Sequence, residues 1–196
     1  MSKIYVGIDH SLSGTGIAIL GEDGSLKHLA TCKSEPDGTS VRQRVWRFRG
    51  LAGNVQAEII HFLSGGTMIG VCCFEGYSFG SNKSHHSAII ESGYEVRSHM
   101  VATVGGAIYE VPPTTLKKFA CGKGNADKAA VVSAMTKLSK TEFRNDNESD
   151  AYALARMAYC MGESVDPGNE PARQSLAVVA GKDEKKSKKA GKVVVA

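Results

Sequence analysis

The chain has 196 residues, of which 42% are hydrophobic, and it carries a formal net charge of +4. This length suits one domain, or one domain with a tail, and the apolar content suffices for a sizeable core. No stretch approaches the ~18 consecutive apolar residues of a membrane helix, and the mild positive charge favours a polyanionic partner over a membrane.

The ends and the cysteines indicate a reducing compartment. The first residues, MSKIYVGID, enter a strand pattern directly, without a secretory signal, so we expect a cytoplasmic protein. The five cysteines form neither a CxxC pair nor a zinc-binding spacing, and their odd number argues against a disulfide framework. We therefore expect free thiols.

Three strands and a long helix are predicted first. Apolar runs predict strands at 3–9, 15–20 and 27–33, whose short connections favour an antiparallel meander. Residues 39–63 then predict a helix with one apolar face. That face consists of Phe48, Leu51, Ala52, Val55, Ile59 and Phe62.

Strands and helices alternate in the next hundred residues. The predicted elements are a strand at 67–74, a helix at 86–103, a strand at 107–111, a short helix opened by PPTT, and helices at about 126–139 and at 146–162. This order predicts an α/β domain over residues 1–162, a mixed five-stranded sheet with helices on both faces.

The composition changes at residue 163. ESVDPGNEP has the residues of a turn-rich linker, and residues 181–192 carry six lysines and two acids. We expect 163–196 to be a lysine-rich, largely disordered tail. Its lysines offer DNA a sequence-independent attraction that weakens as salt increases.

Acidic residues stand where apolar segments end or begin. Asp9 ends the first strand and Glu75 follows the strand at 67–74, so both carboxylates reach one sheet edge if the strands are neighbours. Asp150 begins the apolar part of the last helix, and Asn147 and Asp146 share its face. Glu148 points roughly the opposite way, where its charge suits the helix N-terminus.

These carboxylates suggest a metal site. Like charges in a partly buried site repel one another unless a cation lies between them. Oxygen ligands without a His/Cys set favour Mg²⁺ or Mn²⁺ over zinc, and two such ions can support phosphodiester hydrolysis. The alternative is a separate structural role for each residue: a loop cap at Asp9, a salt bridge at Glu75 and a helix cap at Asp150.

Four motifs carry a family resemblance. GIDHSLSGTGIAIL, FEGYSFGSNKS, EVPPTTLKKFACGKGNADK and DNESDAYALA resemble, in order and spacing, the RuvC-type Holliday junction resolvases, most closely the RuvC-like proteins of bacteriophages. The resemblance covers about residues 3–162. It implies a ribonuclease H-like fold, a homodimer in the cytoplasm of a bacterial host, and cleavage of branched DNA with Mg²⁺, for which Mn²⁺ is expected to substitute.

The resemblance also implies roles for single residues. Asp9, Glu75 and Asp150 match the family's catalytic metal ligands. The family commonly places Asp or His where this chain has Asn147, so either Asn147 or Asp146 is expected to complete the metal site.

DNA contacts are expected on two segments. Lys117 and Lys128 match family lysines that resemble contacts to the strand backbone, and Lys118 and Lys123 are their neighbours. The turn around Lys123 could instead be an ordinary glycine turn. After Glu75 comes a loop with three candidates, Tyr77, Phe79 and Lys83. One of its two aromatics is expected to stack on an unpaired base at the junction, and the other to pack under the loop.

Other functions compete with this one. The opening also resembles the phosphate loop of actin-like and sugar-kinase ATPases, but these need two such domains, so no nucleotide cofactor is expected. A broader branch nuclease acting on forks, flaps and three-way junctions is an alternative, as is a catalytically inactive junction-binding protein.

Overall fold

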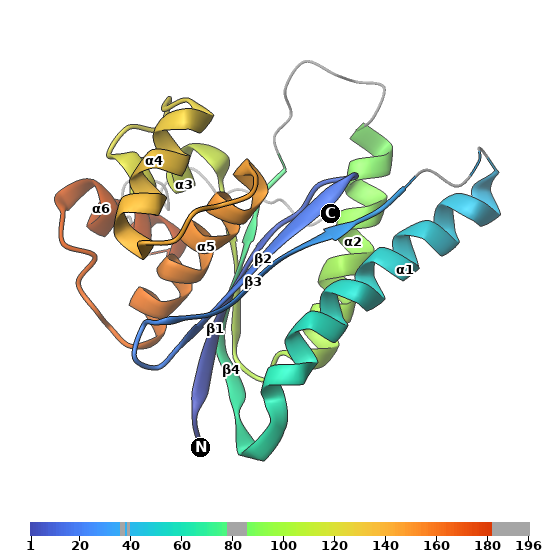
Figure 1. The fold of residues 1–196 in the computed structure, drawn as a ribbon, viewed down its shortest axis with the longest axis horizontal. Helices are drawn as coiled ribbons and strands as arrows, with labels where there is room; N and C mark the ends of the chain where they lie inside the picture. The colour runs from blue at the N-terminus through green and yellow to red at the C-terminus, as the bar shows by residue number, and fades with distance from the viewer. Residues whose placement is uncertain (36–37, 39, 78–85, 182–196) are drawn as a thin grey trace, which may run out of the picture.

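The computed structural model describes residues 1–35, 38, 40–77 and 86–181, and its centre is a five-stranded sheet (Figure 1). The strands are β1 (Lys3–Asp9), β2 (Gly14–Gly21), β3 (Leu26–Lys33), β4 (Met68–Glu75) and β5 (Ala107–Val111), in the order β3-β2-β1-β4-β5. β1, β2 and β3 are antiparallel neighbours, whereas β4 runs parallel to both β1 and β5. The predicted meander and mixed sheet are confirmed.

Helices cover both faces of the sheet, as predicted. One face carries α1 (Val41–Ile60) and α2 (His86–Thr103), with the 3₁₀ helix η1 (His61–Gly66) following α1. The other carries α3 (Pro113–Cys121), α4 (Lys128–Ser139), α5 (Asp146–Gly162) and α6 (Glu170–Val179). Alternate residues of β1 enter the two cores: Ile4, Val6 and Ile8 on the α1 side, Tyr5 on the α5 side. No helix among the described residues is both long and apolar enough to cross a membrane.

Helix α1 shows how the sequence pattern becomes packing. Its buried residues are Phe48, Leu51, Ala52, Val55 and Ile59, all of the predicted apolar face except Phe62, which lies in η1 and packs partly buried against the same core. Ser40 begins the helix with a capping box to Gln43. The helix ends at Ile60 rather than at residue 63, and the 3₁₀ turn after it includes Gly65 at a positive φ of 66°. Residues 64–66, SGG, explain the earlier end.

Two glycines bring α5 directly against the sheet. A Cβ on Gly7 of β1 would overlap the main-chain carbonyl of Ala151, and one on Gly16 of β2 would overlap that of Asn147. Both lie on the same face as Asp9, since Gly7 is two residues away along β1 and Gly16 is its cross-strand partner. The N-terminal turns of α5 therefore lie beside the end of β1.

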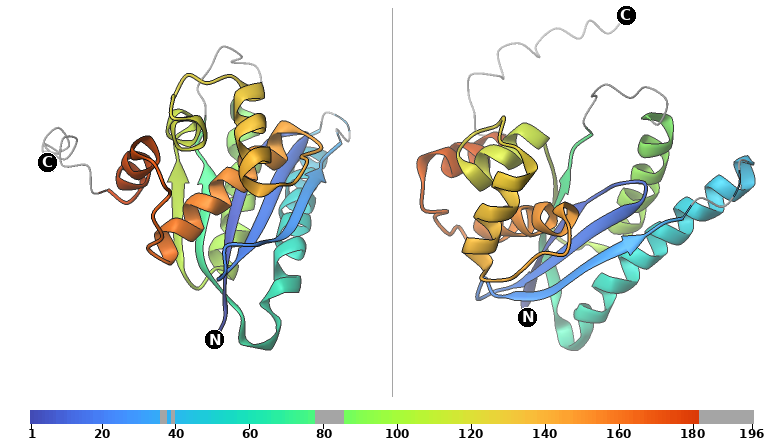
Figure 2. Two further views of the ribbon diagram at one scale, coloured as in Figure 1. Left: turned by 60° about the vertical axis from the view of Figure 1, so that its left-hand side comes forward. Right: turned by 45° about the horizontal axis from the view of Figure 1, so that its top comes forward.

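Helix α6 corrects one prediction. Disorder was expected over 163–196, but residues 170–179 form a helix beside α3, on the opposite face of the sheet from α1 (Figure 2). Ala172 is buried there, and Leu176 and Val179 pack against the same core, so the segment has an apolar stripe at helical spacing that the sequence analysis missed. Residues 182–196, with the six lysines, lie outside the described residues.

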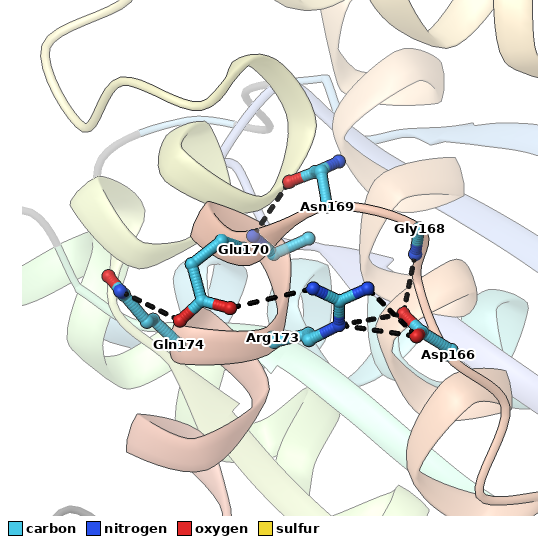
Figure 3. A network of polar contacts seen from close by, with 7 residues as sticks. Asp166, Gly168, Asn169, Glu170, Arg173 and Gln174 are labelled. Atoms are coloured by element: carbon cyan, nitrogen blue, oxygen red, sulfur yellow. Dashed lines mark hydrogen bonds and ion pairs between the residues drawn. The ribbon is translucent and has the colours of Figure 1, made fainter.

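The start of α6 is held by polar contacts (Figure 3). Asn169 caps it by accepting from the Ala172 N–H at 2.9 Å. Arg173 donates from Nη2 and Nε to the Asp166 carboxylate at 2.9 and 3.0 Å, and this carboxylate also accepts from the Gly168 N–H. These contacts join the linker to the helix, and the division of the chain at residue 162 stays a prediction.

Candidate active site

Asp9 and Glu75 are the last residues of two neighbouring parallel strands. β1 and β4 pair with Ile8 beside Phe74, so the next residue of each strand leaves the sheet at the same edge. By alternation, Asp9 shares the face of Tyr5, and Glu75 shares the face of Cys73, which is the face that α5 covers. Asp9 is only 5% exposed. The structure thus brings the two predicted acids together.

Helix α5 adds two more acids. It begins at Asp146, and its N-cap Asn145 accepts from the Glu148 N–H at 2.9 Å. Asp146 and Asp150 are four residues apart and so lie on one face of the helix. Their charges act on the Asp9 carboxyl, so the two acids of α5 lie within electrostatic reach of the acids at the ends of β1 and β4.

The electrostatics of this cluster are those of crowded, desolvated carboxylates. Burial raises the pKa of Asp9 well above its usual range, and so do the charge of Glu75, a hydrogen bond with Glu75, and the charges of Asp150 and Asp146. Burial, together with the charges of Glu75 and Asp146, raises the pKa of Asp150 to about 7. Burial and mutual repulsion thus disfavour the charged forms of Asp9 and Asp150, and a cation between the carboxylates would relieve both.

The donor set fits a hard divalent cation. Carboxylate oxygens are the ligands that Mg²⁺ and Mn²⁺ prefer, and one of them, on Asp9, is almost fully buried. Within the described ranges, no group of three or more His, Cys, Asp or Glu side chains already has the arrangement of a metal site. Mutual repulsion opposes closer approach of such carboxylates until a cation lies between them.

Two predicted lysines lie at this cluster. Lys128, the first residue of α4, contacts the Asp146 carboxylate, and this contact lowers the pKa of Asp146 and raises that of Lys128. The charge of Lys117 on α3 acts on Asp150, where it opposes the rise in pKa. Both lysines are thus within electrostatic reach of the carboxylates.

The other two lysines are placed differently. Lys118 donates to Oε1 of Gln174 on α6 at 2.7 Å. Lys123 is exposed on the turn between α3 and α4. Gly122 is the C-cap of α3, with a φ of 78°. This left-handed conformation explains the glycine without a contact to phosphate.

Asn147 and Glu148 are occupied by contacts within the fold. Asn147 donates from Nδ2 to the Gly14 carbonyl at 2.5 Å, which ties α5 to the start of β2. Glu148 is completely buried; it pairs with Arg144 at 2.8 Å and accepts from Oγ1 of Thr31 at 3.2 Å. Of the two candidates for the fourth ligand, Asp146 is the one whose charge acts on Asp9 and Asp150.

The start of the loop after Glu75 packs on α2. Tyr77 is partly buried, and its hydroxyl donates to the Ile90 carbonyl at 3.2 Å. The guanidinium of Arg97 lies over its ring, with Cζ 4.3 Å from the ring centroid. Phe79 and Lys83 lie outside the described residues.

Sequence reasoning missed two kinds of residue at this site. Gly7 and Gly16 admit α5, and their signal was available: both fall on the same strand face as Asp9. His10 contacts α2, and Arg97 of α2 contacts the end of β4. Both contacts join segments far apart in the sequence, and no motif marks them.

Comparisons with known proteins support the fold. No protein-family model matches the chain, and neither does any curated protein. Thermus thermophilus RuvC superposes with a TM-score of 0.63 at 17% identity, over 81% of this chain and 95% of that one. RuvC of the same organism in complex with Holliday junction substrate gives 0.63 at 16% identity, over 82% and 97%.

A third structure is more distant. The yeast mitochondrial Holliday junction resolvase gives a TM-score of 0.52 at 10% identity, over 90% of this chain and 83% of that one. Together with the five-stranded mixed sheet, these likenesses establish the ribonuclease H-like fold, as expected from the sequence.

Proposed function

We propose that this chain is a divalent-metal-dependent endonuclease that hydrolyses phosphodiester bonds in branched DNA, with four-way junctions as its main substrate. The observation that carries the proposal is the placement of Asp9 and Glu75 at one sheet edge, with Asp150 and Asp146 of α5 within electrostatic reach of them. The fold shared with RuvC, which has been solved in complex with a Holliday junction substrate, supports the choice of branched DNA.

The metal ligands follow from the donor set. Asp9, Glu75 and Asp150 would hold Mg²⁺, or Mn²⁺ in its place, with Asp146 as the fourth ligand. We favour Asp146 over Asn147 because the charge of Asp146 acts on both Asp9 and Asp150, whereas Asn147 carries no charge and its Nδ2 donates to the Gly14 carbonyl. Bound divalent ions supply an activated water and stabilise the leaving oxygen of the cleaved phosphodiester.

The chain's own groups bind and orient the DNA. The exposed amine of Lys128 and the nearby Lys117 lie beside the carboxylates, where they would contact phosphates next to the cleaved bond. Lys118 of α3 and the exposed Lys123, on the turn after α3, would add further contacts to the DNA backbone. Phe79 and Lys83 lie outside the described residues, and their contact with the branch point stays a prediction from the sequence.

Junction resolution requires two such sites. One acidic site hydrolyses one strand, so paired nicks in opposing strands need a second site related by symmetry. We therefore propose a homodimer, which matches the near two-fold symmetry of a four-way junction. The similarity to phage proteins, the bacterial cytoplasm and the lack of a nucleotide cofactor stay predictions from the sequence.

A broader branch nuclease is the second candidate. Tyr77 packs on α2, which is the role expected for one of the two loop aromatics, so only Phe79 is left to stack on a base at the junction. Selectivity for four-way junctions then rests on the remaining aromatic, Phe79.

A panel of labelled substrates tests the proposal. The full chain is incubated in Mg²⁺ with a four-way junction, a three-way junction, a fork, a flap and a linear duplex, with Asp9→Asn as the inactive control. Preferential cutting of the four-way junction supports resolution, and similar cutting of all branched forms supports the broader nuclease. Equal cutting of linear duplex, or retained activity in Asp9→Asn, contradicts both.

A further inference from the structure

The carbonyl of Glu75 stands where β4 leaves the sheet. The next residue, Gly76, still donates its N–H to the Val111 carbonyl at 2.8 Å, but the chain then leaves β5. At this point Arg97 of α2 donates from Nη2 to the Glu75 carbonyl at 3.0 Å. A residue 22 positions further along the chain thus holds the main chain of a proposed metal ligand.

The guanidinium of Arg97 is fixed on several sides. Its Cζ lies 4.3 Å from the ring centroid of Tyr77 and 5.5 Å from that of Phe74, and Nη2 also lies 3.4 Å from Oε2 of Glu110. The side chain is 20% exposed. An arginine is suited to this position because its planar group stacks on aromatic rings while its edge donates, which a lysine ammonium cannot do.

The packing of α2 makes room for this contact. A Cβ on Gly93, one turn before Arg97, would lie within 3.0 Å of Tyr77, Arg97 and His10. His10 follows Asp9, and its Nε2 lies 2.9 Å from Oγ of Ser92 on the same helix. The segment 92–97 of α2 thus contacts the chain beside both strand-end acids, Asp9 and Glu75.

We infer that Arg97 is a positioning residue for the active site: it fixes the main chain at Glu75 so that its carboxylate meets those of Asp9 and Asp150. The inference rests on the proposed function. Arg97 acts through Glu75 and does not itself contact substrate. Residues that orient metal ligands from outside typically change metal affinity 10–100-fold when they are replaced.

Metal binding and cleavage together test this role. Arg97→Met keeps the apolar length of the side chain and removes its donors. We expect it to raise the dissociation constant for Mn²⁺, measured by calorimetry on the full chain, by roughly 10-fold or more. Cleavage of a four-way junction should fall most at limiting metal and recover partly at saturating metal, whereas junction affinity in EDTA should stay within about 2-fold.

Two control variants separate positioning from general charge effects. Arg44→Gln removes an arginine of α1 that pairs with Glu91 of α2 at 3.1 Å, and Glu110→Gln removes the ion pair but keeps the carbonyl contact. Both should bind Mn²⁺ as the unaltered chain does. If Arg97→Met does not fold, Arg97→Lys decides, with an expected Mn²⁺ affinity clearly below that of the unaltered chain.

The outcomes distinguish this inference from the proposed function. If the unaltered chain binds Mn²⁺ and cuts junctions, and the folded Arg97 variant does both equally well, the positioning role is wrong and the proposed function stands. A similar loss in Arg44→Gln would also overturn it. If the unaltered chain neither binds Mn²⁺ nor cuts, the proposed function fails and this inference fails with it.

Discussion

Gly16 of β2 and Asn147 of α5 lie in direct contact, so close that any side chain on the glycine would overlap the Asn147 carbonyl. This contact, repeated between Gly7 and Ala151, sets how near α5 comes to the end of β1. The positions of Asp146 and Asp150 relative to Asp9 depend on it.

We expect Gly16→Ala to push the start of α5 away from the sheet. Overpacking of this kind costs about 1–3 kcal/mol of the free energy of unfolding, and the separated acids should bind Mg²⁺ more weakly. Thermal unfolding and Mg²⁺ titration of cleavage measure the two effects. The matched control is Gly53→Ala in α1, where a Cβ meets nothing within 4 Å and should be neutral or stabilising. Equal behaviour of the two variants would refute the close-packing explanation.

The pH dependence of stability tests the carboxylate cluster without DNA. The pKa of Asp150 is raised to about 7 in the folded chain, against an unfolded value of roughly 3.9. Its stabilising contribution is therefore complete below about pH 4 and is lost as the pH rises towards 7. In EDTA at pH 8, Asp150→Asn should be more stable than the unaltered chain by on the order of 2–4 kcal/mol. At pH 5 this difference in the free energy of unfolding should be smaller.

The effect of Mg²⁺ on the melting temperature is a second test of the same cluster. Adding Mg²⁺ at pH 8 should raise the melting temperature of the unaltered chain, since a ligand that binds only the folded state stabilises it. The shift should be small in Asp150→Asn. A stability difference that does not vary with pH, or an equal Mg²⁺ shift in both proteins, would mean that Asp150 is not part of a repelling cluster.

Asp146 and Asn147 can be ranked as metal ligands. We expect Asp146→Asn to raise the Mg²⁺ concentration for half-maximal cleavage several-fold, because its charge acts on both Asp9 and Asp150. Asn147→Ala should mainly lower the melting temperature, because it loses the bond to the Gly14 carbonyl. Mg²⁺ titrations with both variants measure this. A larger metal shift for Asn147→Ala would reverse the assignment.

Two truncations separate helix α6 from the segment after it. Ending the chain at residue 181 removes six lysines and two acids, and should leave the melting temperature unchanged while weakening DNA binding and its salt dependence. Ending it at residue 162 also removes α6, whose Ala172 and Leu176 pack against the core. This loss should lower the free energy of unfolding by about 2–4 kcal/mol. Equal melting temperatures for the two truncations would show that α6 contributes no stability.

Much of the fold could be predicted because its signals are local. The strand at 3–9, the helix at 86–103 and the helix at 146–162 have the boundaries that their periodicity predicted. Helix α6 was missed because it has only ten residues and lies between turn residues and a run of lysines, and both of these flanking patterns favour disorder.

The site divides in the same way. Asp9, Glu75 and Asp150 could be singled out because each stands at the end or start of an apolar element. The engagement of Asn147 with Gly14 and the contact of Arg97 with Glu75 could not, because both join segments more than twenty residues apart. Such contacts depend on how helices settle on the sheet, which no local pattern specifies.

Cleavage of a cruciform plasmid in Mg²⁺ tests the central claim most directly, that this carboxylate cluster is a nuclease site which acts in pairs on branched DNA. The unaltered chain should convert the supercoiled plasmid to linear product through opposing nicks at the cruciform base, and Asp9→Asn should leave it intact. Linear product with strand-specific labels at opposite positions would support the account. Nicked circles alone would contradict paired action, and equal cutting of a plasmid without a cruciform would contradict recognition of the branch.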